Sequence, residues 1–309
     1  MLHQKNRVGQ RVQEAMSIRI GISGWTYAGW RGAFYPRGLA HGKELEYASR
    51  QFNSIEVNGT FYRLQRPENF AAWYEATPKD FRFALKGSRF ITHMKQLRDI
   101  DAPLANFFAS GVLRLEEKLG PILWQFPARL SYDEARFHGF LAKLPRSTEA
   151  AARLARRHDA RVKGRAWLRT AQDRPLLHAF EVRDPSFLVP EFMELLRHYN
   201  AAFVFSDSSG EWPYAEDVTA NFLYLRLHGA EELYASGYDE DALTAWARRI
   251  TAWSRGGEPA DAQRVGRKAP RRARRDVYVY FDNDRKVRAP FDAQRLNELA
   301  SARSRRKAA

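Results

Sequence analysis

The 309-residue sequence contains no cysteine. Disulfide frameworks, thiolate zinc sites, iron–sulfur clusters and cysteine nucleophiles are therefore excluded. The sequence also lacks an apolar run of the about 18 residues that a membrane-spanning helix needs. Residues 1–17 are polar and hold no apolar stretch of the signal-peptide type. We therefore expect a soluble, cytoplasmic protein that does not interact with membranes.

Acidic residues are also scarce, since 36 Asp and Glu oppose 51 Lys and Arg and leave a formal net charge of +15. Four segments, 1–17, 146–174, 255–275 and 301–309, hold 24 of the basic residues but only 6 of the acidic ones. The remaining chain is slightly negative, with 27 basic and 30 acidic residues. We interpret 1–17 as a mobile basic tail, 301–309 as a second basic tail, and the other two segments as basic insertions, of which 255–275 is a mobile loop. The charge thus predicts a polyanion-attracting periphery.

The rest of the composition, 44% hydrophobic and 13% aromatic, supports a sizeable core. Eight largely apolar runs each end in a polar or glycine-containing turn, the pattern of parallel strands buried on both faces. They are Ile18–Trp25, Ser54–Phe61, Arg82–Ser88, Pro121–Pro127, Leu177–Asp184, Ala201–Asp207, Phe222–Gly229 and Asp276–Asn283. With helices between them, they predict an α/β fold, a single (β/α)₈ barrel of the TIM type over residues 18–300.

Apolar residues at three- and four-residue spacing predict the helices. These are Lys43–Phe52, Pro67–Ala76, Ala105–Leu119, Tyr132–Leu144, Pro190–Tyr199, Asp239–Trp253 and Phe291–Leu299, with a short helix at Thr148–Arg157. Residues 208–221 hold no clear helical pattern. We expect a short or irregular element there, between the sixth and seventh strands.

Polar side chains at the strand ends indicate the functional site, because active sites of such barrels lie at the carboxyl ends of the strands. Glu56 and Asn58, Glu181 and Arg183, and Arg226 and His228 are each two residues apart, so both members of a pair face the same way. Charged residues inside apolar strands are tolerated where they point into the barrel mouth and are paired. Val57, Val182 and Leu227 should then face the helices.

The candidate residues fall into two groups. Glu56, Glu181 and His228 are the catalytic candidates. The substrate-binding candidates are Trp25, Asn58, Tyr62, Lys86, His93, Gln125, Arg183, Asp207, Arg226 and Asn283. The alternative for each charged residue is a structural role, since barrel interiors also contain ion pairs that only neutralise one another. The convergence of so many polar strand ends favours a binding site.

Several sequence runs resemble the YecE-like family, also called domain of unknown function 72. They are GISGWTYAGWRGAFYP, FNSIEVNGTFYRL, FRFALKGSRFITH, KLGPILWQFP, FEVRDPSF, YLRLHG and VYVYFDND, in this order from about residue 18 to 300. The resemblance implies a TIM-type barrel and supports most of the candidates above, but it implies no biochemical activity. The basic segments at 146–174 and 255–275 and the tails depart from the family pattern.

The first functional hypothesis is an enzyme that acts on an anionic, phosphorylated or nucleotide-like substrate by hydrolysis or related acid–base chemistry. Glu56 and Glu181 would be the acid and base, with Lys86 and cationic strand-end groups holding the anion. One variant places a divalent metal at Glu56, Glu181, Asp207 and His228. We rank it lower because nearby cations repel a metal, and we predict no cofactor. Another variant makes Lys86 a Schiff-base nucleophile.

Two further hypotheses belong to other classes. Arg271–Arg275 and the basic tail could bind nucleic acid without sequence specificity by neutralising phosphates. Alternatively, the barrel mouth could serve a small-molecule sensor that binds its ligand without converting it. The sequence leaves the oligomeric state open.

Overall fold

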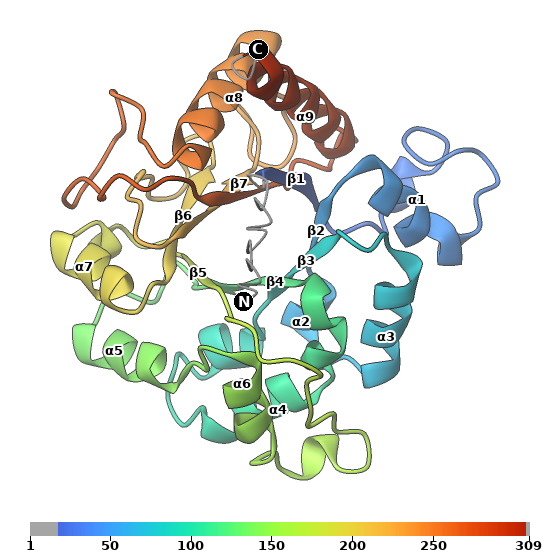
Figure 1. The fold of residues 1–309 in the computed structure, drawn as a ribbon, viewed down its shortest axis with the longest axis vertical. Coiled ribbons are helices and arrows are strands. Elements are labelled where there is room, and N and C mark those ends of the chain that lie inside the picture. Colours follow the sequence, from blue (N-terminus) through green and yellow to red (C-terminus); the bar gives the residue numbers. More distant parts are fainter. Residues whose placement is uncertain (1–17, 307–309) are drawn as a thin grey trace, which may run out of the picture.

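The computed structural model describes residues 18–306 and shows eight parallel strands that close into a barrel (Figure 1). Each strand pairs with its neighbours in sequence, and β8 closes the barrel on β1 with Val277 opposite Ile18. The strands are β1 (Ile18–Ser23), β2 (Ser54–Val57), β3 (Arg82–Lys86), β4 (Leu119–Gln125), β5 (His178–Glu181), β6 (Ala202–Asp207), β7 (Phe222–Leu227) and β8 (Asp276–Phe281). The predicted (β/α)₈ barrel is confirmed.

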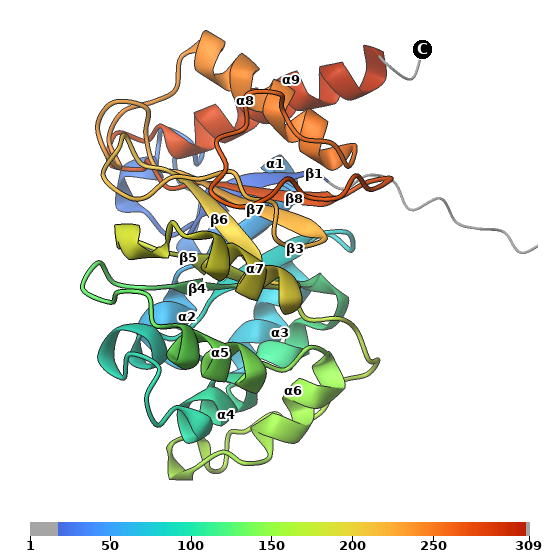
Figure 2. The same cartoon turned by 90° about the vertical axis from the view of Figure 1, so that its left-hand side faces the viewer.

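Helices surround the strands, and α8 and α9 pack side by side against β8 and β1 (Figures 1 and 2). The helices are α1 (Glu44–Gln51), α2 (Gly59–Tyr62), α3 (Pro67–Ala76), α4 (Asp101–Ala109), α5 (Glu134–Lys143), α6 (Thr148–Ala155), α7 (Pro190–His198), α8 (Glu240–Ser254) and α9 (Ala289–Arg306). Within residues 18–306, no helix is long and apolar enough to cross a bilayer. The predicted tail 1–17 and residues 307–309 lie outside the described residues, whereas 301–306 continue α9 rather than forming a tail.

Two buried apolar layers follow from the alternation of side chains along the strands. Val57, Val182 and Leu227 belong to the larger layer, between strands and helices, as predicted. A smaller cluster fills the barrel interior and includes Tyr224 and Tyr280. The hydroxyl of Tyr280 lies 2.6 Å from that of Ser54 across the barrel. The interior is therefore packed, and the hydroxyls of Tyr224 and Tyr280 within it are paired with other side chains.

The predicted helix Ala105–Leu119 is wrong in extent. Helix α4 ends at Ala109, and 3₁₀ turns cover Val112–Lys118. Gly111 separates them with a φ of +118°, and a Cβ there would lie 2.6 Å from the Cα of Pro67. The close approach of α3 therefore breaks the helix, a tertiary effect that apolar spacing does not reveal.

The connection between β6 and β7 contains no helix, as predicted. Its side chains form hydrogen bonds with the backbone of the basic segment 255–275. Its buried Asp217 accepts hydrogen bonds from the backbone amides of Val265 and Gly266 at 2.7 and 2.9 Å. Its buried Glu216 accepts one from the amide of Gln263 at 3.1 Å. Residues 255–275 form no helix or strand, yet two buried carboxylates hold their backbone in place.

Candidate functional site

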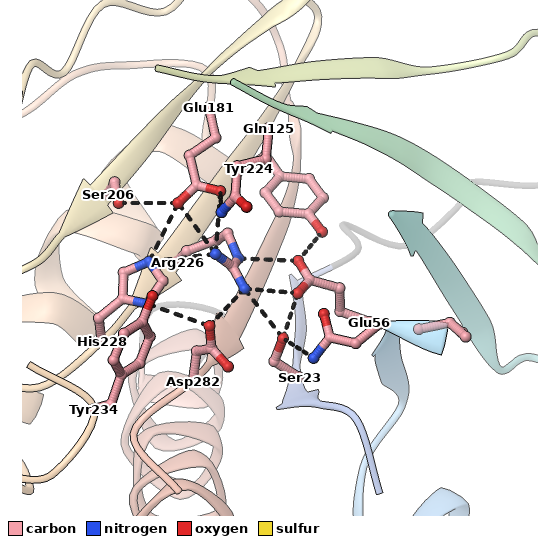
Figure 3. Close-up of polar contacts among 12 residues, drawn as sticks. Ser23, Glu56, Gln125, Glu181, Ser206, Tyr224, Arg226, His228, Tyr234 and Asp282 are labelled. Atoms are coloured by element: carbon pink, nitrogen blue, oxygen red, sulfur yellow. Dashed lines mark hydrogen bonds and ion pairs between the residues drawn. The ribbon is translucent and has the colours of Figure 1, made fainter. Parts of the chain in front are cut away.

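A buried arginine occupies the carboxyl end of the barrel (Figure 3). The Nε and Nη2 atoms of Arg226, on β7, donate to the two carboxylate oxygens of Glu56 at 3.1 and 2.9 Å. Its Nη1 atom donates to both oxygens of Glu181 at 3.1 Å, and Nη2 also donates to Asp282 Oδ2 at 2.7 Å. One guanidinium thus binds three carboxylates, from β2, β5 and the residue after β8.

The Glu56 carboxylate receives further hydrogen bonds from the barrel interior (Figure 3). The hydroxyl of Tyr224 donates to Oε2 at 2.6 Å, and the hydroxyl of Ser23 donates to Oε1. The side-chain amide of Asn58 in turn donates to Ser23 Oγ at 3.2 Å. Each oxygen of Glu56 therefore accepts bonds from two different side chains, which satisfies a carboxylate removed from water.

The Glu181 carboxylate is enclosed in the same way (Figure 3). Gln125 Nε2 donates to its Oε2 at 2.6 Å, and Ser206 Oγ donates to its Oε1 at 3.4 Å. The buried His228 ring lies between two carboxylates, with Nε2 3.4 Å from Glu181 Oε1 and Nδ1 3.4 Å from Asp282 Oδ2. His228 thus lies within the buried network, although its Nδ1 makes no hydrogen bond among the described residues.

Electrostatics keep two of these carboxylates ionised. Burial alone would raise the pKa of Glu181, but Arg226 and the His228 hydrogen bond hold it well below its usual value. Burial likewise opposes ionisation of Asp282, but Arg226 and His228 lower its pKa to about 2. The same carboxylates overcome the burial of Arg226 and raise its pKa well above normal. At neutral pH neither Glu181 nor Asp282 has a proton to donate.

A cavity of about 690 Å³ adjoins this network at the mouth of the barrel. Its wall contains five cationic side chains but only two carboxylates, Asp282 and Asp284. The cations come from the end of β3 and the turn after it, the loop after β4, the segment after β5 and the loop after β8. They are Lys86, Arg89, Arg129, Arg183 and Arg285. The cavity therefore favours anions, and one of its two carboxylates, Asp282, is already paired with Arg226.

Lys86 lies at the end of β3, where it is 7% exposed. Its Nζ atom is 4.5 Å from the centre of the Phe61 ring. Burial, followed by repulsion from Arg226, lowers the pKa of Lys86 to about 8. A fraction of the side chain is therefore a neutral amine near physiological pH.

Two more residues of the cavity wall have pKa values that differ from their usual ones. Burial raises the pKa of Asp284 to about 6, and the nearby negative charge of Asp282 adds to this shift. Burial also lowers the pKa of His93 to about 4, with help from Lys86. His93, on the π-helical turn Phe90–Met94, is therefore neutral at pH 7 and able to accept a proton.

Arg183 is held in place by aromatic residues. Its guanidinium carbon lies 3.7 Å from the centre of the Trp212 ring, and Nη2 donates to the Tyr234 hydroxyl at 3.3 Å. Its buried Nε has no hydrogen-bond partner among residues 18–306. Stacking thus fixes a planar cation beside the cavity.

The predicted site residues divide into three groups. Asn58, Tyr62, Lys86, His93, Gln125 and Arg183 line the cavity. Glu56, Glu181, Arg226 and His228 come together behind its wall, with no exposed side-chain surface. Trp25, Asp207 and Asn283 do not line the cavity.

The last three side chains are held by other partners. The ring of Trp25 packs edge-on against Trp73 of α3, with centroids 5.6 Å apart. Asp207 accepts a hydrogen bond from the Tyr238 hydroxyl at 3.0 Å. Asn283 donates to Asp292 of α9 at 2.8 Å and to the carbonyl of Ser236. Alternation misses the directions of Trp25 and Asn283 because it holds only within a regular strand, and both residues lie beyond strand ends.

Sequence reasoning missed several contributors to the site. Ser23 ends β1 and Asp282 follows β8, and both bind the network; their positions at strand ends were the available signal. Arg89, Arg129, Tyr234 and Arg285 reach the cavity from loops or turns. No periodic pattern predicts where a loop side chain points.

The four residues of the metal variant are not arranged as a cation site. The guanidinium of Arg226 lies between Glu56 and Glu181, and Asp207 is bonded to Tyr238. In the part of the chain that the structure describes, no three His, Asp or Glu side chains form a group able to hold a metal ion. The carboxylates of Glu56 and Glu181 instead bind the guanidinium of Arg226.

Comparison with known proteins gives a family match over the barrel and relatives that align over part of it. The family model described as "Protein of unknown function DUF72" matches residues 19–309. The chain is 35% identical over 130 residues to the UPF0759 protein YecE of Escherichia coli K12, and 31% identical over 115 residues to the UPF0759 protein YunF of Bacillus subtilis. These alignments cover 41% and 36% of this chain, and 44% and 40% of the relatives, less than half of each.

Solved structures share the fold. A DUF72 family protein of Thermotoga maritima superposes with a TM-score of 0.69 at 23% identity, covering 92% of this chain and 99% of that one. A DUF72 family protein of Enterococcus faecalis gives a TM-score of 0.64 at 16% identity, covering 92% and 95%. Together with the family match over 19–309, these findings confirm the predicted resemblance. The chain belongs to the DUF72 family.

Proposed function

We propose that the protein is an enzyme that binds a small phosphorylated substrate at the mouth of the barrel and acts on it by acid–base chemistry. The observation that carries this proposal is the surplus of cations around the cavity of about 690 Å³, five against two carboxylates. A volume of this size suits a small ligand. Cations from several separate segments can surround a phosphate and neutralise its charge.

Arg183 is the residue best suited to contact the phosphate. Its plane is set by stacking on Trp212 at 3.7 Å, so little side-chain entropy is lost when an anion binds. The side chain lines the cavity, although its Nε is itself buried. Arginine recognises phosphate oxygens through two guanidinium donors at once.

Lys86, His93 and Asp284 supply the acid–base chemistry in this proposal, because all three line the cavity. Asp284, with a pKa of about 6, exchanges a proton near neutral pH. Neutral His93 accepts a proton, and Lys86, with a pKa of about 8, either holds an anion or acts as an amine. The Schiff-base variant of the reaction would use the same Lys86 amine.

Glu56, Glu181 and His228 take a supporting role. None of the three side chains is exposed, and Glu181 keeps no proton at neutral pH. Their effect reaches the cavity through charge, since Arg226 lowers the pKa of Lys86 while Glu181 and Glu56 raise it. We infer that the network tunes Lys86 and positions Asp282.

The proposal is tested by screening phosphorylated sugars, nucleotides and pyrophosphate for thermal stabilisation, and then for conversion by ³¹P NMR. Asp284→Asn should lower turnover while binding persists, and Arg183→Met should weaken binding. Arg153→Met on α6 is the matched control, because its side chain is 64% exposed and lies outside the cavity wall. Stabilisation without conversion by any bound compound would favour the sensor. The absence of stabilisation by every anion would refute the proposed function.

A further inference from the structure

A second, smaller cavity of about 230 Å³ shares a wall residue with the first. Tyr62, the last residue of α2, lines both cavities. The second cavity lies between α2, the segment after β3 and helix α4. Its wall is formed by Tyr62, Arg63, Leu64, Ser88, Phe90, Pro103, Asn106 and Arg161. At this volume it fits a ring-sized fragment rather than a complete ligand, for which pockets are about 300–1,000 Å³.

Tyr62 is unusual for a large aromatic residue because 66% of it is exposed. Its ring meets Phe61 edge-on at 5.1 Å, and the guanidinium of Arg89 lies 5.9 Å from its centre. Leu64, Phe90 and Pro103 add apolar surface to the second cavity. An exposed aromatic face between two cavities is suited to stack on a planar group that spans them.

Hydrogen-bonding groups accompany this apolar surface. Asn106 on α4 lines the cavity although it is 2% exposed. Its Oδ1 accepts a hydrogen bond from the amide of Asp159 at 3.0 Å. Ser88 Oγ accepts from the amide of Phe90 at 3.3 Å and retains its own proton to donate. The cavity thus offers a hydroxyl donor, Ser88 Oγ, beside flat apolar surface.

We propose that the second cavity binds the heteroaromatic ring of a ligand whose phosphate lies in the first, so that the substrate class is a nucleoside monophosphate. Stacking on Tyr62 and a hydrogen bond from Ser88 Oγ to a ring acceptor recognise a base. A sugar phosphate leaves this apolar surface unused. This inference rests on the proposed function, because the phosphate must occupy the cationic cavity.

The test is a calorimetric titration of the full chain with the four common nucleoside monophosphates and with ribose 5-phosphate. At least one nucleotide should bind about fivefold or more tightly than ribose 5-phosphate. Tyr62→Ala should remove most of this advantage. Leu64→Trp, which fills the cavity, should do the same. Phe291→Ala on α9 is the control, since Phe291 is also exposed, at 48%, but lies outside both cavities.

The outcomes separate the two proposals. If ribose 5-phosphate binds as tightly as every nucleotide, or if Tyr62→Ala and Leu64→Trp keep the nucleotide preference, the second cavity does not bind the base and this inference is overturned. The proposed function survives that result. If neither ribose 5-phosphate nor any nucleotide or other anion binds, the proposed function fails as well.

Discussion

Replacing Arg226 by Met should strongly destabilise the protein. The change keeps most of the side-chain volume but removes the cation that binds Glu56, Glu181 and Asp282. Two of these carboxylates have no exposed surface, so they cannot regain water without local rearrangement. Breaking a buried ion pair by removing one partner costs about 3–5 kcal/mol. We expect a loss of this order in the free energy of unfolding at pH 7.

The pH dependence of stability should change as well. In the wild type the folded-state pKa values of Glu181 and Asp282 are depressed. Their contribution to stability is therefore present above the unfolded pKa values of about 4 and is lost as pH falls toward 2. Without Arg226, burial becomes the dominant influence on Glu181 and raises its folded-state pKa. The variant should therefore lose stability as pH rises above about 4.

Urea unfolding between about pH 4 and 8 measures both effects. Arg295→Met is the matched control, because Arg295 is 45% exposed and pairs with Glu240 and Glu298 on the surface. It should cost no more than about 1 kcal/mol. Adding Glu181→Gln to Arg226→Met should recover part of the lost stability at pH 7. The reasoning is refuted if Arg226→Met costs no more than the control or keeps the wild-type pH slope.

Three further predictions concern the cavity and the backbone. Affinity for pyrophosphate, measured by calorimetry, should fall as pH rises through about 8, because Lys86 loses its charge there. Lys86→Met should abolish this pH dependence. An unchanged pH profile in that variant would contradict the assignment. If a turnover is found, its rate should titrate near the Asp284 pKa of about 6, and Asp284→Asn should remove that limb of the pH–rate profile. Gly111→Ala should lower the free energy of unfolding, measured in urea, by more than about 1 kcal/mol. Gly139→Ala in α5, where a Cβ meets nothing within 4 Å, should raise it. Similar values for both variants would argue against strain at Gly111.

The barrel itself could be predicted from sequence because its strands are buried on both faces. Such strands appear as short apolar runs, and the helices between them as three- and four-residue spacing. Two-residue spacing also placed Val57 against the helices and Glu56 in the barrel interior. These properties depend on the local chain, so a single sequence is enough to reveal them.

Side chains beyond the strands could not be placed in this way. Trp25 and Asn283 follow strand ends and turn toward helices, whereas Arg129 and Tyr234 reach the cavity from loops. Their directions depend on loop conformation and on neighbours distant in sequence. The break at Gly111 has the same origin, since α3 comes from an earlier part of the chain.

Net charge illustrates the same division. The sequence alone determined that the barrel-forming part of the chain is slightly negative and that the excess positive charge lies in four segments. Only the tertiary structure decided that Arg226 neutralises carboxylates from three strand ends, while other cations surround a cavity. The physical reason is that Coulomb energy depends on distance and burial. Closure of the barrel sets both for residues as far apart in sequence as Glu56 and Asp282.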